Sequence, residues 1–157
     1  MFIGLVLLQA IILNKVNFGG YVNPYVFPLF IIMLSFEIKN WILLLLAFLL
    51  GLTIDMFSGT LGIHAFSTVL MAFMRPIFLK NVPPKTDKIN YPSLNENGLG
   101  WMLLYISTLL SIHHFTYFLL EAGSFNNIQH TLLLTFLSLS MSIFISFLLI
   151  FTFNNEK

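Results

Sequence analysis

Residues 41–80 read WILLLLAFLLGLTIDMFSGTLGIHAFSTVLMAFMRPIFLK, two apolar runs joined by the turn Ser58-Gly-Thr-Leu-Gly62. A helix that crosses a bilayer needs about 20 mostly apolar residues, with a range of roughly 17–25. Each run is of that length, and glycines in a short connecting stretch are typical of a turn. The pattern therefore predicts an antiparallel pair of membrane-spanning helices over residues 41–57 and 63–80.

The composition of the whole chain supports the same class of protein. Of the 157 residues, 58% are hydrophobic and only 8% are charged, and the mean hydropathy is +0.92. A soluble domain carries about 25% charged residues, and no soluble fold of this length could bury so much apolar surface. A net charge of +1 without a basic stripe also argues against nucleic-acid binding. We therefore expect an all-α polytopic membrane protein.

Turn signals and charges divide the chain into six predicted transmembrane helices, which form a single transmembrane domain over residues 1–157. The predicted helices cover about 1–14, 24–36, 41–57, 63–80, 99–121 and 130–153. The second of these is short for a span, and Pro28 lies in its first turns, where a missing N–H costs least. Residues 81–98, with three prolines and four asparagines, are expected to form an exposed cytoplasmic loop.

The positions of Lys and Arg predict the orientation of these helices, because cytoplasmic loops of membrane proteins carry an excess of both. With both termini and the 81–98 loop in the cytoplasm, Lys15 is the one basic residue on the outer side. The cytoplasmic side then receives Lys39, Arg75, Lys80, Lys85, Lys88 and Lys157. We therefore expect a multi-pass protein of the cytoplasmic (inner) membrane, in contact with membrane lipid.

Asp55 and His64 are the first candidate functional residues, because ionisable groups inside an apolar span are costly. The two lie at matching distances on either side of the turn. In an antiparallel pair of helices they therefore share one depth, roughly 6 Å below the turn. Two interpretations stay open. The carboxylate and the imidazole share a proton or hold the hairpin closed, or both side chains reach the outer interface and cap the turn.

Arg75, at the other end of the 63–80 helix, is also a candidate. It either anchors the inner leaflet by contact with lipid phosphates or backbone carbonyls, or it contacts a partner helix or the inner loop. Small residues allow helices to approach closely in membranes. We expect this role, together with formation of the turn, for Gly51, Gly59, Gly62 and Ala65.

His113 and His114 in the 99–121 helix raise the question of a metal site near Asp55 and His64. The chain has neither an HExxH motif nor two histidines four residues apart on one helix face. We therefore expect no metal, and instead a hydrogen-bonded polar layer. The chain also lacks a nucleophile elbow, paired intramembrane aspartates, a P-loop and a dinucleotide fingerprint. The prediction is a protein without enzymatic activity and without a cofactor.

The order and spacing of residues within 41–80 resemble the MreD family of rod-shape-determining membrane proteins. The shared pattern is a G-x-x-x-D helix end, a glycine-containing turn, a Leu-Gly-x-His-Ala start and a small-residue helix that ends near Arg. In this chain the matching residues are Gly51, Asp55, Gly59, Gly62, His64, Ala65 and Arg75-Pro76. The upstream stretch Asn17-Phe-Gly-Gly-Tyr-Val-Asn-Pro-Tyr25 is similar to the form of the family found in Bacteroidota.

The resemblance implies a non-enzymatic integral membrane component of the cell-elongation (rod-shape) complex, which supports lateral peptidoglycan synthesis by binding other membrane proteins. The implied direct partner is an MreC-like bitopic protein. Indirect partners are an MreB-like actin homologue, a RodA-type polymerase and a class B penicillin-binding protein. The implied fold is that of the six-helix substrate-binding subunit of energy-coupling-factor transporters. Because fold does not fix function, a small-solute (vitamin-type) uptake subunit of such a transporter is the alternative.

Overall fold

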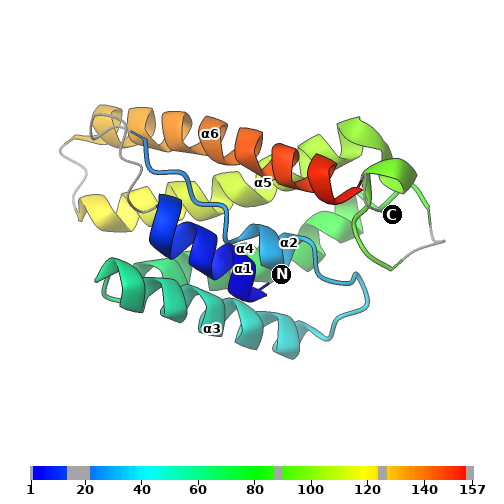
Figure 1. Cartoon of the computed structure of the whole chain (residues 1–157), viewed down its shortest axis with the longest axis horizontal. Helices are drawn as coiled ribbons and strands as arrows, with labels where there is room; N and C mark the ends of the chain where they lie inside the picture. The colour runs from blue at the N-terminus through cyan, green and yellow to red at the C-terminus, as the bar shows by residue number, and fades with distance from the viewer. Residues whose placement is uncertain (1, 14–21, 87–89, 124–126, 155–157) are drawn as a thin grey trace.

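The computed structural model describes residues 2–13, 22–86, 90–123 and 127–154, and the regular structure within those ranges is helical (Figure 1). Four of these helices are long and apolar enough to cross a membrane. They are α3 (Asn40–Ser58), α4 (Ile63–Asn81), α5 (Leu94–Ala122) and α6 (Ile128–Asn154). By the length and composition of its helices, the chain is a helical membrane protein.

The long helices pack in chain order, α3 against α4, α4 against α5 and α5 against α6, with each pair antiparallel (Figure 1). α1 (Phe2–Leu7) and the π-helical turn η1 (Leu8–Ile12) lie against α3. The short helix α2 (Leu29–Ile32) contacts α3, α4 and α5, so it lies inside the bundle. The centre of the hydrophobic core is formed around it by the fully buried side chains of Val26, Phe27, Ile31 and Ile32.

The later helices lie where the sequence predicts them, with small shifts at their ends. α3 and α4 slightly extend the predicted ranges 41–57 and 63–80, and α6 begins just before residue 130. α5 begins earlier than residue 99, but Gly98 has non-helical angles (φ 77°, ψ 160°), so the regular helix starts after it. At the start of the chain, α1 and η1 together cover Phe2–Ile12 of the predicted range 1–14, and residues 1 and 14 lie outside the described residues.

The prediction of a continuous helix over 24–36 is wrong. Residues 22–26 have no regular structure, and only Leu29–Ile32 are α-helical. Pro24 and Pro28 explain the difference, because neither can donate a backbone hydrogen bond and each biases the residue before it towards an extended conformation. Among the described residues, four of the six predicted spans are therefore helices of spanning length.

The described residues of the polar segment 81–98, on either side of residues 87–89, contact one end of the bundle. Trp101 Nε1 donates hydrogen bonds to the carbonyl oxygens of Pro83 (2.9 Å) and Val82 (3.3 Å). The N–H of Phe36 donates to the carbonyl oxygen of Asn90 at 2.6 Å. The described parts of the segment thus contact the end of the bundle where α3 begins and α4 ends, while many of their residues stay exposed, as the sequence predicts.

α3 and α4 meet at a close crossing. A Cβ atom added to Gly51 would lie 2.5 Å from Ala65 Cα and 2.7 Å from the carbonyl oxygen of His64. These distances are too short for any side chain, so only glycine fits, and the crossing is one in which small residues let two backbones approach. At the turn, Gly59 (φ 69°) and Gly62 (φ 85°) adopt the left-handed conformation that glycine tolerates.

Gly51→Ala is expected to lower the free energy of unfolding, because α3 and α4 must separate to admit the methyl group. Overpacking of this kind costs about 1–3 kcal/mol. Gly100→Ala in α5 is the matched control, since its Cβ meets nothing within 4 Å and alanine favours a helix over glycine. Denaturant unfolding in detergent micelles measures both variants. A Gly51→Ala protein as stable as the control would contradict the close crossing.

Candidate functional site

Asp55 in the last turn of α3 caps the start of α4 across the turn. One carboxylate oxygen accepts from Thr60 Oγ1 at 2.5 Å and from the N–H of His64 at 3.0 Å, and the other accepts from the N–H of Ala65 at 2.9 Å. The first N–H groups of a helix have no partner within it, and a carboxylate there faces the positive end of the helix dipole. Since Asp55 is only 3% exposed, these three donors stabilise a buried charge.

The structure combines the two interpretations of Asp55 and His64. The carboxylate contacts His64, but it does so through the backbone N–H. The imidazole is not among the described hydrogen-bond partners of the carboxylate, and its Nδ1 has no hydrogen-bond partner in the described part of the chain. Asp55 caps the turn, yet both side chains are buried inside the protein, with His64 only 1% exposed.

Gln9 of η1 holds the extended segment that precedes α2. Its Nε2 donates to the carbonyl oxygen of Pro24 at 3.0 Å, and its Oε1 accepts from the N–H of Val26 at 2.9 Å. Non-helical backbone at membrane depth is tolerated only where the protein satisfies its polar groups. The buried amide of Gln9 thus pairs one backbone carbonyl oxygen and one backbone N–H that would otherwise need helical partners.

α6 supplies further partners, together with His114 of α5. Ser142 Oγ accepts from the N–H of Tyr25 at 2.9 Å, and Ser138 Oγ accepts from the N–H of Asn23 at 3.0 Å. His114 Nδ1 lies 2.9 Å from the carbonyl oxygen of Leu110, and its Nε2 lies 2.8 Å from Ser142 Oγ. A carbonyl oxygen can only accept. In the neutral imidazole, Nδ1 therefore carries the proton and Nε2 is an acceptor. The Ser142 hydroxyl has one proton, and both Nε2 and the carbonyl oxygen of Ser138, at 2.8 Å, lie within reach of it. A hydrogen-bonded polar layer therefore joins α5, α6 and the extended segment.

Arg75 lies at the opposite end of the same segment. Its Nε donates to the Tyr105 hydroxyl oxygen at 2.7 Å, and that hydroxyl donates to the carbonyl oxygen of Ile32 at 2.9 Å. Its terminal nitrogens donate to the carbonyl oxygens of Leu34 and Ser35. Arg75 is 1% exposed, so it contacts backbone carbonyls inside the protein and does not reach lipid phosphates. The backbone carbonyl groups that follow α2 are therefore hydrogen-bonded inside the protein.

Aromatic and imidazole rings fill the bundle near the Asp55 end. The ring centroid of Tyr25 lies 4.8 Å from that of His64, 4.7 Å from Tyr117 and 6.0 Å from His113. His113 is fully buried, and neither of its ring nitrogens has a hydrogen-bond partner among the described residues. Tyr117 donates from its hydroxyl to Glu121 at 2.9 Å. The ring cluster therefore extends from the core to the Glu121 carboxylate at the end of α5.

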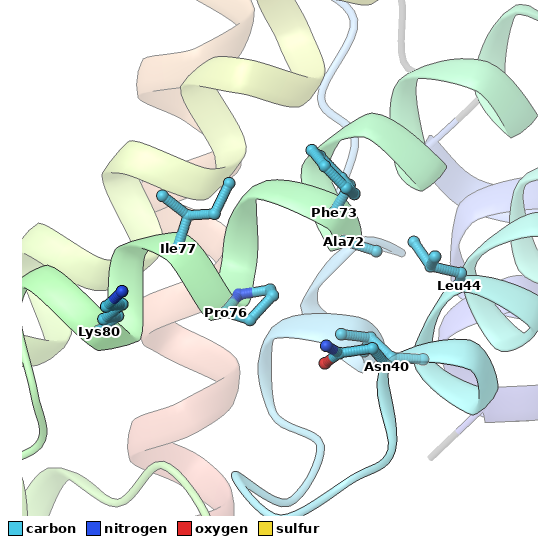
Figure 2. A pocket seen from close by; sticks show the side chains of 8 residues that line it. Asn40, Leu44, Ala72, Phe73, Pro76, Ile77 and Lys80 are labelled. Atoms are coloured by element: carbon cyan, nitrogen blue, oxygen red, sulfur yellow. The ribbon is translucent and has the colours of Figure 1, made fainter.

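An apolar groove of about 340 Å³ lies between α3 and α4, near the Arg75 end of the bundle. Figure 2 shows Leu44 of α3 and Phe73, Pro76 and Ile77 of α4 around it, with Lys80 at one end. The groove is bordered by outward-facing residues, since Phe73 and Ile77 are about half exposed. It is therefore a surface that another helix or a lipid chain can enter.

A second cavity, of about 320 Å³, lies beside the α3–α4 turn at the other end of the bundle. Its lining is polar and aromatic and includes Tyr25, His64, Tyr117 and Glu121. Across the described residues, no group of three or more His, Asp or Glu side chains is placed to hold a metal ion. The chemistry of this pocket is therefore that of hydroxyl, imidazole and carboxylate groups on an aromatic wall.

The structure brings Gly51, Asp55, His64 and Ala65 together at the hairpin and places Arg75 apart from them. Sequence reasoning missed Gln9 and Tyr105, which hold the extended segment and α2. A lone Gln in an apolar run is a signal of a buried, bonded side chain. Tyr105 gives no such signal, because tyrosine is common at membrane interfaces.

Comparison of the chain with protein-family models, with curated proteins and with solved structures found no match.

Asp55→Ala is expected to lower the free energy of unfolding by about 2–4 kcal/mol, because three donors inside the protein lose their acceptor. Asp55→Asn should lose less stability, because one acceptor oxygen remains. Its NH2 group faces a backbone N–H, however, and two donors cannot pair. Thr60→Val removes one of the three donors and is the graded control. Unfolding in detergent micelles should rank stability as wild type, Thr60→Val, Asp55→Asn, Asp55→Ala. Equal stability of Asp55→Ala and Thr60→Val would contradict the capping role.

Arg75→Met and Tyr105→Phe are expected to be non-additive in stability, because the two side chains hydrogen-bond to each other and to neighbouring carbonyls. A coupling energy of about 0.5–3 kcal/mol is typical of residues in one network. Arg75→Met combined with Thr60→Val, at opposite ends of the bundle, should add within about 0.5 kcal/mol. A double-mutant cycle in micelles measures both pairs, and additivity of the first pair would show that this contact contributes nothing.

Proposed function

We propose that this protein is a non-enzymatic integral membrane component of the cell-elongation complex and that it acts by binding other membrane proteins. The resemblance of residues 41–80 to the MreD family supports the proposal. The matching residues have defined structural parts in the hairpin: Gly51 and Ala65 at the crossing, Gly59 and Gly62 in the turn, and Asp55 as the cap. The proposed direct partner is an MreC-like bitopic protein, through which the MreB-like filament, the RodA-type polymerase and the class B penicillin-binding protein are reached.

The apolar groove between α3 and α4 is the observation that carries this proposal (Figure 2). Ala72 is buried in its lining, while Phe73 and Ile77 stand exposed beside it. Helix association in membranes depends on close packing rather than on the hydrophobic effect. A hollow flanked by large apolar side chains suits the protruding side chains of another helix, and the turn between α3 and α4 is too short to offer much other contact surface.

We propose that the occupant of the groove is the single transmembrane helix of that partner. Lys80 lies beyond Pro76 and Ile77 on α4, and Asn40 lies beside Leu44 on α3 (Figure 2), whereas the rest of the lining is apolar. A partner helix that fits is therefore apolar along its length and carries an acidic side chain at the end next to Lys80, where opposite charges fix the register.

We propose the cytoplasm as the location of both termini and of residues 81–98. Lys39 precedes α3 and Lys80 lies in the last turn of α4, so both stand at this end of the bundle. Lys15, Lys88 and Lys157 lie outside the described residues.

The number of passes depends on whether the buried segment over 22–36 can cross a bilayer. An extended chain advances about 3.3 Å per residue against 1.5 Å in a helix, so this segment is long enough to do so. Six passes, as in energy-coupling-factor substrate-binding subunits, are compatible with this length.

Cysteine labelling tests the orientation, and the chain has no native cysteine. An impermeant maleimide is expected to label Leu61→Cys, whose position in the α3–α4 turn is 99% exposed, in intact spheroplasts. Thr86→Cys should react only after the membrane is permeabilised. The reverse pattern would show the opposite orientation.

Photo-crosslinking tests the groove. A benzophenone side chain at Ile77 is expected to capture a single-span protein in the native membrane, because Ile77 borders the groove. The same group at Phe136, which is 68% exposed on α6, is the matched control and should capture little of that partner. Lys80→Glu should reduce the crosslink by placing like charges together. Equal capture from both positions would contradict partner binding in the groove.

The alternative function, a vitamin-type uptake subunit, is favoured by one observation, the polar cavity beside the α3–α4 turn. Depletion in the native host distinguishes the two functions. The elongation role predicts rounded cells or loss of width control with unchanged uptake of nutrients. Co-purification of an ATPase pair and tight binding of a vitamin would instead select the transporter.

A further inference from the structure

We propose that the pocket beside the α3–α4 turn binds a primary ammonium group. The pocket has a volume of about 320 Å³ and is bounded by the extended segment, the end of α3, the start of α4 and the end of α5. Its polar and aromatic lining residues include Asn23, Tyr25, Thr60, His64, Tyr117 and Glu121. The inference does not rest on partner binding in the α3–α4 groove, which lies at the other end of the bundle.

The charges around the pocket favour a cation. None of its described lining residues is Lys or Arg, whereas Glu121 lines it and Asp55 lies directly behind Thr60 and His64. The oxygens of Asp55 are occupied by three donors. The Glu121 carboxylate accepts, among the described residues, from the Tyr117 hydroxyl, and an ionised carboxylate has room for further N–H donors.

Aromatic rings line the same pocket. The centroids of Tyr25 and Tyr117 are 4.7 Å apart, and His64 stacks on Tyr117 at 4.4 Å. A cation within about 6 Å of an aromatic face is attracted by the ring, and more strongly when it is withdrawn from water. These rings already pack against one another, so binding immobilises few side chains. A carboxylate beside a preformed aromatic wall is a lining suited to ammonium groups.

His64 adds an imidazole ring to the wall of the pocket. It lines the pocket and is 1% exposed, and its Nδ1 has no hydrogen-bond partner among the described residues. This nitrogen is closed to solvent, so the group that a ligand N–H meets in the pocket is the exposed Glu121 carboxylate. A primary ammonium group has three N–H donors, whereas a quaternary one has none. The primary group is therefore the better match.

Other ligand classes fit this pocket less well. An anion would meet Glu121 and Asp55 with no Lys or Arg among the described lining residues. A metal ion needs a group of ligating side chains that the described residues do not offer. The volume suits a small molecule or a headgroup. The ammonium group therefore comes either from a soluble amine or from the headgroup of phosphatidylethanolamine in the surrounding leaflet.

The test uses the purified full chain in nanodiscs of phosphatidylglycerol, a lipid without an ammonium group. In one arm, ethanolamine is titrated in and followed by calorimetry, with uncharged ethylene glycol as the comparison. In the other arm, part of the lipid is replaced by phosphatidylethanolamine, and native mass spectrometry measures its retention after transfer to detergent. Binding in the first arm identifies a soluble amine, and retention in the second alone identifies the lipid headgroup.

Glu121→Gln is expected to weaken binding by about tenfold or more in whichever arm binds, because a charge-assisted hydrogen bond is lost. Glu96→Gln, near the start of the same helix, is the matched control and should leave binding unchanged. Both positions are exposed, so both variants should remain folded, and thermal unfolding checks this. The proposal is overturned if neither probe binds, if ethylene glycol binds as well as ethanolamine, or if the two variants bind alike.

Discussion

Backbone N–H and C=O groups inside a membrane-spanning bundle need partners within the protein, and residues 22–36 are where this requirement is hardest to meet. A continuous helix would satisfy it locally, but prolines interrupt this segment. Its partners come from the surrounding helices instead. Gln9 and Ser142 hydrogen-bond the extended part, while Arg75 and Tyr105 hydrogen-bond the carbonyl groups at its other end. An irregular segment can therefore occupy the centre of the core.

This arrangement accounts for the many buried polar side chains in a chain of such high hydropathy. Several of them, such as Gln9, Arg75 and Ser142, hydrogen-bond the segment, and Asp55 bonds the start of α4. Large apolar side chains cover the outward faces of the long helices. The same arrangement keeps two surfaces apart. The hairpin of α3 and α4, fixed by Gly51 and Asp55, carries the polar pocket at one end and the apolar groove near the other. The two proposed binding events therefore use one rigid hairpin without sharing residues.

The hairpin is predictable from sequence because its signals are local: apolar length gives the helices, and glycines give the turn. For Asp55, spacing gives the depth of the carboxylate but cannot tell whether an imidazole or a backbone N–H faces it. The segment 24–36 is not predictable in the same way, since its hydropathy indicates burial, which is correct, but not the extended backbone. The partners that make this backbone possible, such as Tyr105 for Ile32, are far apart in the chain, and no local pattern encodes such a pairing.

Amide hydrogen exchange in nanodiscs, read residue by residue, tests the central claim most directly. If side chains of the surrounding helices hold the extended segment, the amides of Tyr25 and Val26 exchange as slowly as those in the middle of α3. Gln9→Leu should then speed exchange at Val26, and Ser142→Ala at Tyr25, with α3 unchanged in both variants. Rapid exchange at both amides in the wild-type protein, or no response to either substitution, would contradict the account.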